Sequence, residues 1–191
     1  MARKYLVLFL TFLIFACSDI FSTRDPEDPT SDGDVYIAES ISELITNFKS
    51  SLLSLDKTIY ELLLIDPVAT GKSYSFISSA EDIPEPNIFN DWDIDNEKTF
   101  ISGIKNAGST FSDIDLTLDG NHDESLDSLE ITLDYSMIFT DSVQTTIKGS
   151  FTFEVIKVDG HFWYINKWSD RYYDLSIGEK SFSKLKQPYI Y

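Results

Sequence analysis

The chain has 191 residues and carries 15 Lys and Arg against 32 Asp and Glu, a formal net charge of −17 at pH 7. Hydrophobic residues make up 42% and aromatic residues 14%, so enough apolar surface can be buried to offset the ordering entropy, which excludes general disorder. Binding to a nucleic-acid backbone depends on Lys and Arg, and the acidic balance argues against that class of partner. A single cysteine, Cys17, excludes an internal disulfide and a zinc site of several thiolates.

Residues 1–16 are typical of an export signal. Arg3 and Lys4 form a positively charged start, and Tyr5–Phe15 is an almost unbroken apolar run. A helix of that length reaches only about 16 Å, against about 30 Å of bilayer hydrocarbon. The run is therefore interpreted as the apolar part of a signal peptide and not as a membrane span.

The end of this run resembles the lipobox of bacterial lipoproteins. Ile14 is aliphatic at the third position before Cys17, and Ala16 directly before the cysteine is small. The resemblance implies cleavage before Cys17 and attachment of acyl chains such as palmitate to that residue, and Ser18 in place of Asp implies sorting to the outer membrane. Each buried methylene contributes about 0.8 kcal/mol, so two or three acyl chains anchor a protein firmly. The alternative is an ordinary signal peptide with a chance cysteine.

A spacer and one domain are predicted after the signal. Residues 17–35 are rich in Ser, Thr, Asp and Glu and poor in apolar residues, which indicates a flexible acidic tether. From residue 36 to 191 one domain is expected. Its first part carries apolar residues at spacings of three and four, the mark of an amphipathic helix: Ile37, Ile41, Leu44, Phe48, Leu52, Leu55, Ile59 and Leu62. The helix is expected to break near 54–56, and Pro67 stops it.

The next segment, 67–95, is expected to be irregular apart from a short strand at Tyr74–Ile77. A second helix is predicted over Asn96–Ala107, capped by Asp95 or Asn96, with an apolar face of Phe100, Ile101 and Ile104. Glu97 suits its first turn, and Gly108 is a natural stop.

After Gly108 the apolar period changes to two. The alternation predicts strands near 114–118, 129–137, 145–155 and 161–168, with a hairpin turn at Asp159–Gly160. Each strand has one apolar face, so the fold class is α+β, with the helices packed on one face of an antiparallel sheet. The outward residues are polar: Glu130, Thr132, Asp134, Ser136, Thr146, Thr152 and Glu154.

Several segments resemble the NTF2-like (SnoaL-like) superfamily. These are the amphipathic first helix, a Trp followed by Glu97 at the start of another helix, and the antiparallel sheet that closes with Trp163–Asp170. A group of bacterial lipoproteins of unknown role is similar at Trp92, Glu97, Phe111–Leu118, Trp163–Asp170 and the tail Ser181–Lys186. The resemblance implies a cone of helices on a curved sheet over about residues 36–175, and dimers through the exposed sheet face. It implies no particular activity, because this fold carries both enzymes and non-enzymes.

Acid–base catalysis in that superfamily uses a carboxylate or histidine inside the cone. The inward strand positions here are interpreted as holding no Asp, Glu or His, which disfavours such chemistry. The candidate pocket residues are Tyr135, Met137, Phe151, Phe153, Trp163 and His161. Tyr135 is a candidate ligand contact or a core residue, and bulky neighbours can close the cavity altogether.

A second candidate site is a calcium loop. Oxygen-bearing side chains fall at the ligand positions of an EF-hand loop: Asp119, Asn121, Asp123, Ser125, Asp127 and Glu130. The sixth position is Glu124, where that turn normally needs glycine, and the flanks are predicted as strands. A charged hairpin loop accounts for the same residues.

The hypothesis favoured by the sequence is a lipid-anchored cell-envelope protein with a non-catalytic ligand-binding or assembly domain. Such a protein is expected to need no cofactor. Its expected partners are the membrane, a second copy of the chain or another envelope protein. Two alternatives stay open: a small enzyme acting on an apolar substrate through Tyr135 and a residue of 67–95, and a calcium-stabilised surface module.

Overall fold

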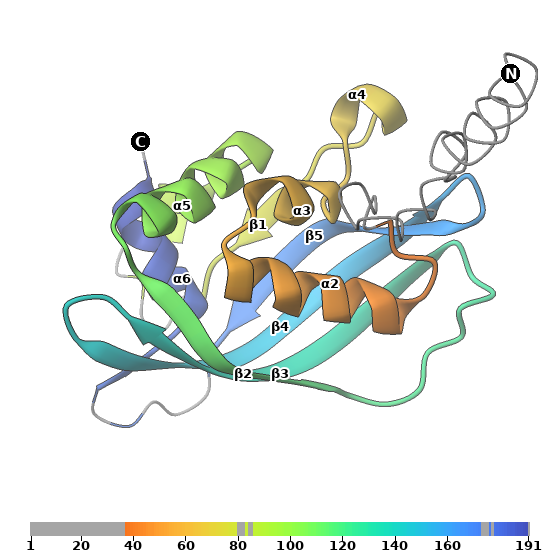
Figure 1. Ribbon diagram of the computed structural model, residues 1–191. Helices are drawn as coiled ribbons and strands as arrows, with labels where there is room; N and C mark the ends of the chain where they lie inside the picture. The colour runs from red at the N-terminus through yellow and green to blue at the C-terminus, as the bar shows by residue number, and fades with distance from the viewer. Residues whose placement is uncertain (1–36, 80–82, 84–85, 173–175, 177, 191) are drawn as a thin grey trace, which may run out of the picture. The chain divides into compact units, whose positions relative to one another are not determined.

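The computed structural model describes residues 37–79, 83, 86–172, 176 and 178–190, so the signal segment and the whole of the tether lie outside the described residues. The fold is α+β, as predicted (Figure 1). The helices are α2 (Ile41–Ser54), α3 (Lys57–Leu62), α4 (Pro67–Thr70), the 3-10 helix η1 (Pro86–Phe89), α5 (Ile94–Asn106), α6 (Phe182–Lys186) and the 3-10 helix η2 (Gln187–Tyr189). The strands are β1 (Ser75–Ile77), β2 (Thr110–Leu118), β3 (Ser128–Thr140), β4 (Gln144–Val158), β5 (Phe162–Arg171) and β6 (Glu179–Lys180).

The predicted break in the first helix is confirmed. Leu55 ends α2 in the left-handed conformation (φ 49°), and the Asp56 carboxylate caps α3 by accepting the N–H groups of Thr58 and Ile59. The apolar stripe of α2 is buried on the sheet, where the ring of Phe48 meets Phe151, Phe153 and Trp168 nearly edge to face. In Figure 1, α2 and α3 lie over one face of the sheet.

The second long helix begins earlier than the apolar pattern predicts. Asp93, and not Asp95 or Asn96, is the N-cap of α5, and a reciprocal bond from its backbone N–H to the Asn96 side chain completes a capping box. Phe100, Ile101 and Ile104 are fully buried, as predicted. The helix ends before Gly108, which takes a left-handed conformation at φ 72°.

The four long strands form an antiparallel meander in the order β5–β4–β3–β2, as predicted. Asp159 and Gly160 take φ values of 53° and 71° between β4 and β5, which fits the predicted two-residue hairpin. The sheet as a whole is mixed, however, because β1 pairs in parallel with β5 and β6 pairs in parallel with β4. Both added strands are short.

The helical face of the sheet is closed by aromatic packing. Within the described residues, α2, α5 and the C-terminal α6 share one continuous core with the inner faces of β3, β4 and β5. None of the seven outward polar residues named above is buried. In the part of the chain that the structure describes, no helix is long and apolar enough to cross a membrane.

Candidate functional site

The C-terminal helix α6 lies inside the cone, so the interior is filled by the chain itself. Phe182 is fully buried, and its ring packs 5.1 Å from Trp168, 5.3 Å from Phe151 and 5.6 Å from Phe100, measured between centroids. Ser181 caps the helix by accepting the N–H of Lys184. The sequence predicts no helix here, and the tail proves to be part of the core.

The Glu97 carboxylate is completely buried and accepts four hydrogen bonds. Its Oε1 receives Tyr74 at 2.5 Å and Trp92 Nε1 at 2.8 Å, and its Oε2 receives Tyr60 at 2.8 Å. The fourth donor is Lys186, whose Nζ lies 2.5 Å from Oε1. Three of the four donors therefore converge on Oε1 and one on Oε2, so both carboxylate oxygens are engaged. Burial and the adjacent Glu97 raise the pKa values of both tyrosines.

Lys186, at the end of α6, is the buried counter-ion of Glu97. Its ammonium lies over the rings of Trp168 and Phe76, 3.8 and 3.9 Å from their centroids. Burial lowers the pKa of Lys186 to about 8, against the attraction of Glu97, which favours the charged form.

A second buried carboxylate, Asp170, holds the start of α6. Oδ2 accepts the backbone N–H of Ser183 at 2.6 Å and its hydroxyl at 2.5 Å, while Oδ1 accepts the hydroxyl of Tyr135 at 2.8 Å. The Tyr135 oxygen in turn accepts the N–H of Phe182 at 2.9 Å. Burial raises the pKa of Asp170 to about 6, although these hydrogen bonds favour its ionised form.

These buried groups correct one expectation from the sequence. The inner surface of the cone does hold carboxylates, Glu97 and Asp170, together with the ammonium of Lys186. Each is engaged by protein groups from separate parts of the chain, so the network ties α6 to α5 and β5. The network holds these elements together, and it presents no exposed acid or base.

The six predicted pocket residues fall into two groups. Tyr135, Met137, Phe151, Phe153 and Trp163 are buried core residues, at most 3% exposed, whereas His161 is exposed beside the β4–β5 turn. None of the six lines either of two hollows that open on the surface of the described residues. Tyr135 donates to Asp170, in keeping with the interpretation of a core residue whose hydroxyl reaches a partner.

The six predicted calcium ligands lie in and next to the β2–β3 connection, and all are exposed. The segment joins two strands, as the hairpin interpretation requires. Asp123 accepts the N–H and the hydroxyl of Ser125, at 3.1 and 2.7 Å. Among the described residues, no three His, Cys, Asp or Glu side chains are grouped closely enough to hold a metal ion.

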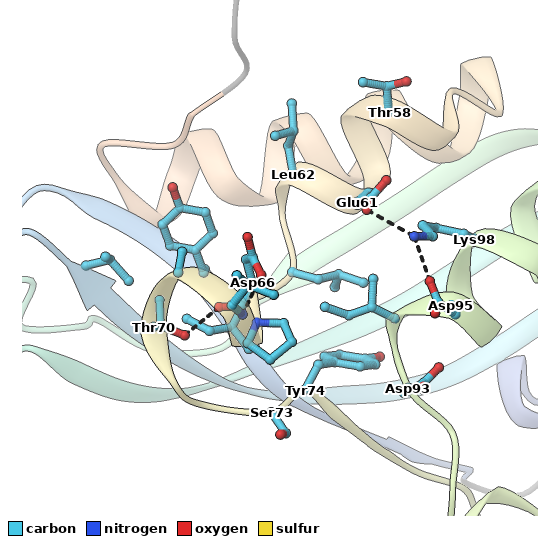
Figure 2. A pocket seen from close by; sticks show the side chains of 18 of the residues that line it. Thr58, Glu61, Leu62, Asp66, Thr70, Ser73, Tyr74, Asp93, Asp95 and Lys98 are labelled. Carbon is cyan, nitrogen blue, oxygen red and sulfur yellow. Dashed lines mark hydrogen bonds and ion pairs between the residues drawn. The ribbon is translucent and has the colours of Figure 1, made fainter.

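The larger surface hollow has a volume of about 670 Å³ and lies where α3, α4 and the start of α5 face β5 (Figure 2). We call it the acidic cleft. Its charged lining comprises five carboxylates and one ammonium: Glu61, Asp66, Asp93, Asp95, Asp159 and Lys98. Its main apolar lining comprises Leu62, Leu64, Ile65, Pro67, Val68, Ile94 and Val158, with the rings of Tyr74 and Tyr164.

The charges of the acidic cleft are partly fixed by local structure. Lys98 bridges α5 to α3, with Nζ 2.6 Å from Asp95 and 3.2 Å from Glu61, as the dashed lines in Figure 2 show. Asp66 and Asp93 are the N-caps of α4 and α5. The rim therefore keeps a negative excess around an apolar floor, and Leu62 and Val68 are exposed there at 38% and 93%.

Two spacings in the sequence point to the buried charges. Glu97 precedes Phe100, Ile101 and Ile104 by three, four and seven positions, which places it on the apolar face of α5. Asp170 follows the buried Trp168 by two positions, on the same face of β5. A bulge in the β4–β5 pairing shifts the alternation between Ile165 and Trp168 and obscures that relationship.

Comparison with known proteins identifies the fold. No protein-family model matches the chain, and no curated protein matches its sequence. Among solved structures, an NTF2-like protein of unknown function in nutrient uptake from Rhodospirillum rubrum aligns at a TM-score of 0.51 with 12% identity, over 71% of this chain and 99% of that one. A ketosteroid isomerase-like protein from Erwinia carotovora atroseptica aligns at 0.52 with 9% identity, over 71% and 95%.

The domain therefore has the NTF2-like cone fold that the sequence segments predict. At such low identity the likeness concerns the fold alone, and this fold carries ligand-binding proteins as well as enzymes.

Proposed function

We propose that the chain is a lipid-anchored protein of a bacterial outer membrane, whose domain is a non-catalytic binding module. The acidic cleft is its binding site, and the partner is a segment of another envelope protein that combines positive charge with apolar side chains. The observation that carries this proposal is the cleft itself, an open hollow of about 670 Å³ that joins an apolar floor to a negative rim.

The burial and hydrogen bonding of the two carboxylates inside the cone support a non-catalytic role. A general base needs an acceptor atom that a substrate proton can reach. Glu97 accepts four hydrogen bonds and Asp170 accepts three, and both side chains are buried beneath α6. Tyr135, the residue of the alternative enzyme hypothesis, is engaged with Asp170 and with the backbone of Phe182.

The lining of the acidic cleft supports a cationic and apolar partner. Five carboxylates line it against a single ammonium, that of Lys98, which lies between Asp95 and Glu61. Val68 is 93% exposed at the rim, and an apolar side chain left so open gains free energy when a partner covers it. Opposite charge on the partner adds attraction that is strongest at low salt.

The cleft is tested with short labelled peptides, one alternating Lys and Leu, one Glu and Leu, and one Lys and Ser. We expect saturable binding of the Lys-Leu peptide alone. Two cleft variants should weaken it several-fold, the double variant Asp95→Asn with Asp159→Asn and the single variant Val68→Ser.

Each cleft variant has a matched control outside the cleft. The double variant Asp119→Asn with Asp134→Asn removes the same charge, and Val143→Ser changes the same type of side chain. Equal binding to cleft and control variants, or no binding, contradicts the proposal.

The anchor is tested separately in cells that export the full chain. Cys17→Ser removes the thiol that would be acylated, so we expect the protein to leave the membrane fraction and to lose incorporation of labelled palmitate. The wild-type chain in the same cells is the control. Retention of Cys17→Ser on the membrane contradicts lipid anchoring without bearing on the cleft.

A further inference from the structure

The ammonium of Lys186 is enclosed by a cage of aromatic rings. Five ring centroids lie within 5.5 Å of Nζ, and the Glu97 carboxylate accepts a hydrogen bond from it. The rings belong to Phe76, Trp92, Phe100, Trp168 and Phe182. Cations bind to the faces of aromatic rings at such distances, and the attraction is stronger away from water.

The cage is made largely by parts of the chain other than the helix that fills it. Phe76 lies on β1, Phe100 on α5 and Trp168 on β5, while Trp92 lies between η1 and α5. Glu97 is fixed by Tyr60, Tyr74 and Trp92, none of which belongs to α6. Four rings and the carboxylate are thus positioned by the rest of the cone, and Lys186 enters from the C-terminal segment together with Phe182.

We propose that the cone contains a binding site for a primary alkylammonium group, and that this chain occupies the site with Lys186 as an internal ligand. The site requires a positive charge for the ring faces and an N–H donor for Glu97. A quaternary ammonium lacks the donor, and a neutral alcohol lacks the charge. The inference concerns the cone interior and is independent of the acidic cleft.

A purely structural role for Lys186 makes a different prediction. If the pair serves stability alone, apolar side chains of similar volume in place of both Lys186 and Glu97 serve as well, because replacing a whole buried ion pair by apolar groups is often neutral or stabilising. If the cage is a ligand site, an external molecule with the right group must bind when the side chain is removed. The two roles are separated by adding the missing group back from solution.

The test uses the domain in its full chain with Lys186→Ala. Alanine keeps Cβ, so the atoms removed correspond to n-propylammonium. We expect this cation to raise the thermal unfolding midpoint in a saturable manner, because a ligand that binds only the folded state stabilises it. Equal concentrations of 1-propanol and tetramethylammonium, at matched ionic strength, should give less than a tenth of that shift.

Lys184→Ala is the matched control, because Lys184 reaches Gln187 at 2.7 Å and lies outside the cage. It and the wild-type chain should not respond to n-propylammonium. If Lys186→Ala is unfolded in buffer, refolding is followed by circular dichroism, and n-propylammonium but not 1-propanol should restore the folded signal. Adding Glu97→Gln to Lys186→Ala should abolish the preference for the cation.

Three results overturn the proposal. One is an equal response of Lys186→Ala to 1-propanol and n-propylammonium. Another is no stabilisation or refolding by n-propylammonium at any concentration. The third is a Lys186→Met variant as stable as the wild type, since methionine fills the same space without charge or donor.

Discussion

Glu97 and Lys186 are 89 positions apart in the chain, and their side chains meet inside the cone with 2.5 Å between Oε1 and Nζ and no exposure of either residue. The contact joins α5, in the middle of the sequence, to the end of α6. Because both charges are away from water, each depends on the other for compensation. This buried ion pair therefore holds the C-terminal segment against the core. Removing either charge alone should destabilise the fold, because the other charge is then left buried without compensation.

Glu97→Gln should lower the free energy of unfolding by about 3–5 kcal/mol, because it leaves the Lys186 ammonium buried without its counter-charge. Urea unfolding followed by tryptophan fluorescence measures the loss. Asp95→Asn, in the same helix, is the control, since Asp95 is 81% exposed and its pair with Lys98 lies at the surface, where an ion pair contributes little to stability. Equal losses in the two variants would contradict the assigned role of Glu97.

Asp170 should make stability fall as the pH rises from about 4 to 6. Burial raises its pKa from 3.8 to about 6, so the folded state binds this proton more tightly than the unfolded state does. The contribution is complete below the unfolded pKa and is lost as the pH rises through the folded value. The free energy of unfolding of the wild type minus that of Asp170→Asn should decline across this window. A flat or rising difference would show that the carboxyl is ionised in the fold.

The elements of the fold could be predicted from the sequence where local spacing determines them. The stripe of α2 has apolar residues every three or four positions, and Asp56 is a good cap directly after the break at Leu55. The strand β3 alternates without interruption from Ile131 to Phe139. The parallel pairings of β1 and β6 could not be predicted, because strands of three and two residues carry too little pattern to specify a partner.

The buried charges lie beyond what local patterns specify. The sequence predicts only that Glu97 lies in the first turn of its helix, where an acidic side chain is favourable whether or not it is buried. Its burial depends on donors as distant as Tyr60 and Lys186, and no rule of spacing connects them. The acidic cleft was missed for a similar reason, since three helices and β5 must come together before its carboxylates share one hollow.

Calcium should not change the thermal unfolding midpoint of the domain. Asp123 is engaged with Ser125, and the described residues hold no group of three acidic or metal-binding side chains placed for an ion. Calcium bound only by the folded state would raise the midpoint, so unfolding is compared in millimolar calcium, in magnesium and with a chelator. A rise that is specific to calcium and absent in Asp119→Asn would restore the calcium hypothesis.

Gly149→Ala should destabilise the domain by about 3 kcal/mol, near the upper end for overpacking in a core. Gly149 pairs with Tyr135 across β3 and β4, and an added Cβ would overlap the carbonyl oxygen of Arg171 and lie 2.6 Å from the Tyr135 hydroxyl. That ring is stacked on Phe151 at 3.9 Å and its hydroxyl is bonded to Asp170, so it has no room to withdraw.

The control for this variant is Gly120→Ala, where φ is +75° and no atom lies within 4 Å of the added Cβ. Only the cost of a left-handed conformation remains there, about 1–2 kcal/mol.

Loss of the Tyr135–Asp170 contact in Gly149→Ala should also loosen the start of α6, because the Tyr135 oxygen accepts the N–H of Phe182. Hydrogen exchange of the Phe182 and Ser183 amides should therefore accelerate in Gly149→Ala and remain slow in Gly120→Ala. Unchanged protection in Gly149→Ala would show that α6 is held by its aromatic packing and the Lys186 pair without help from β3.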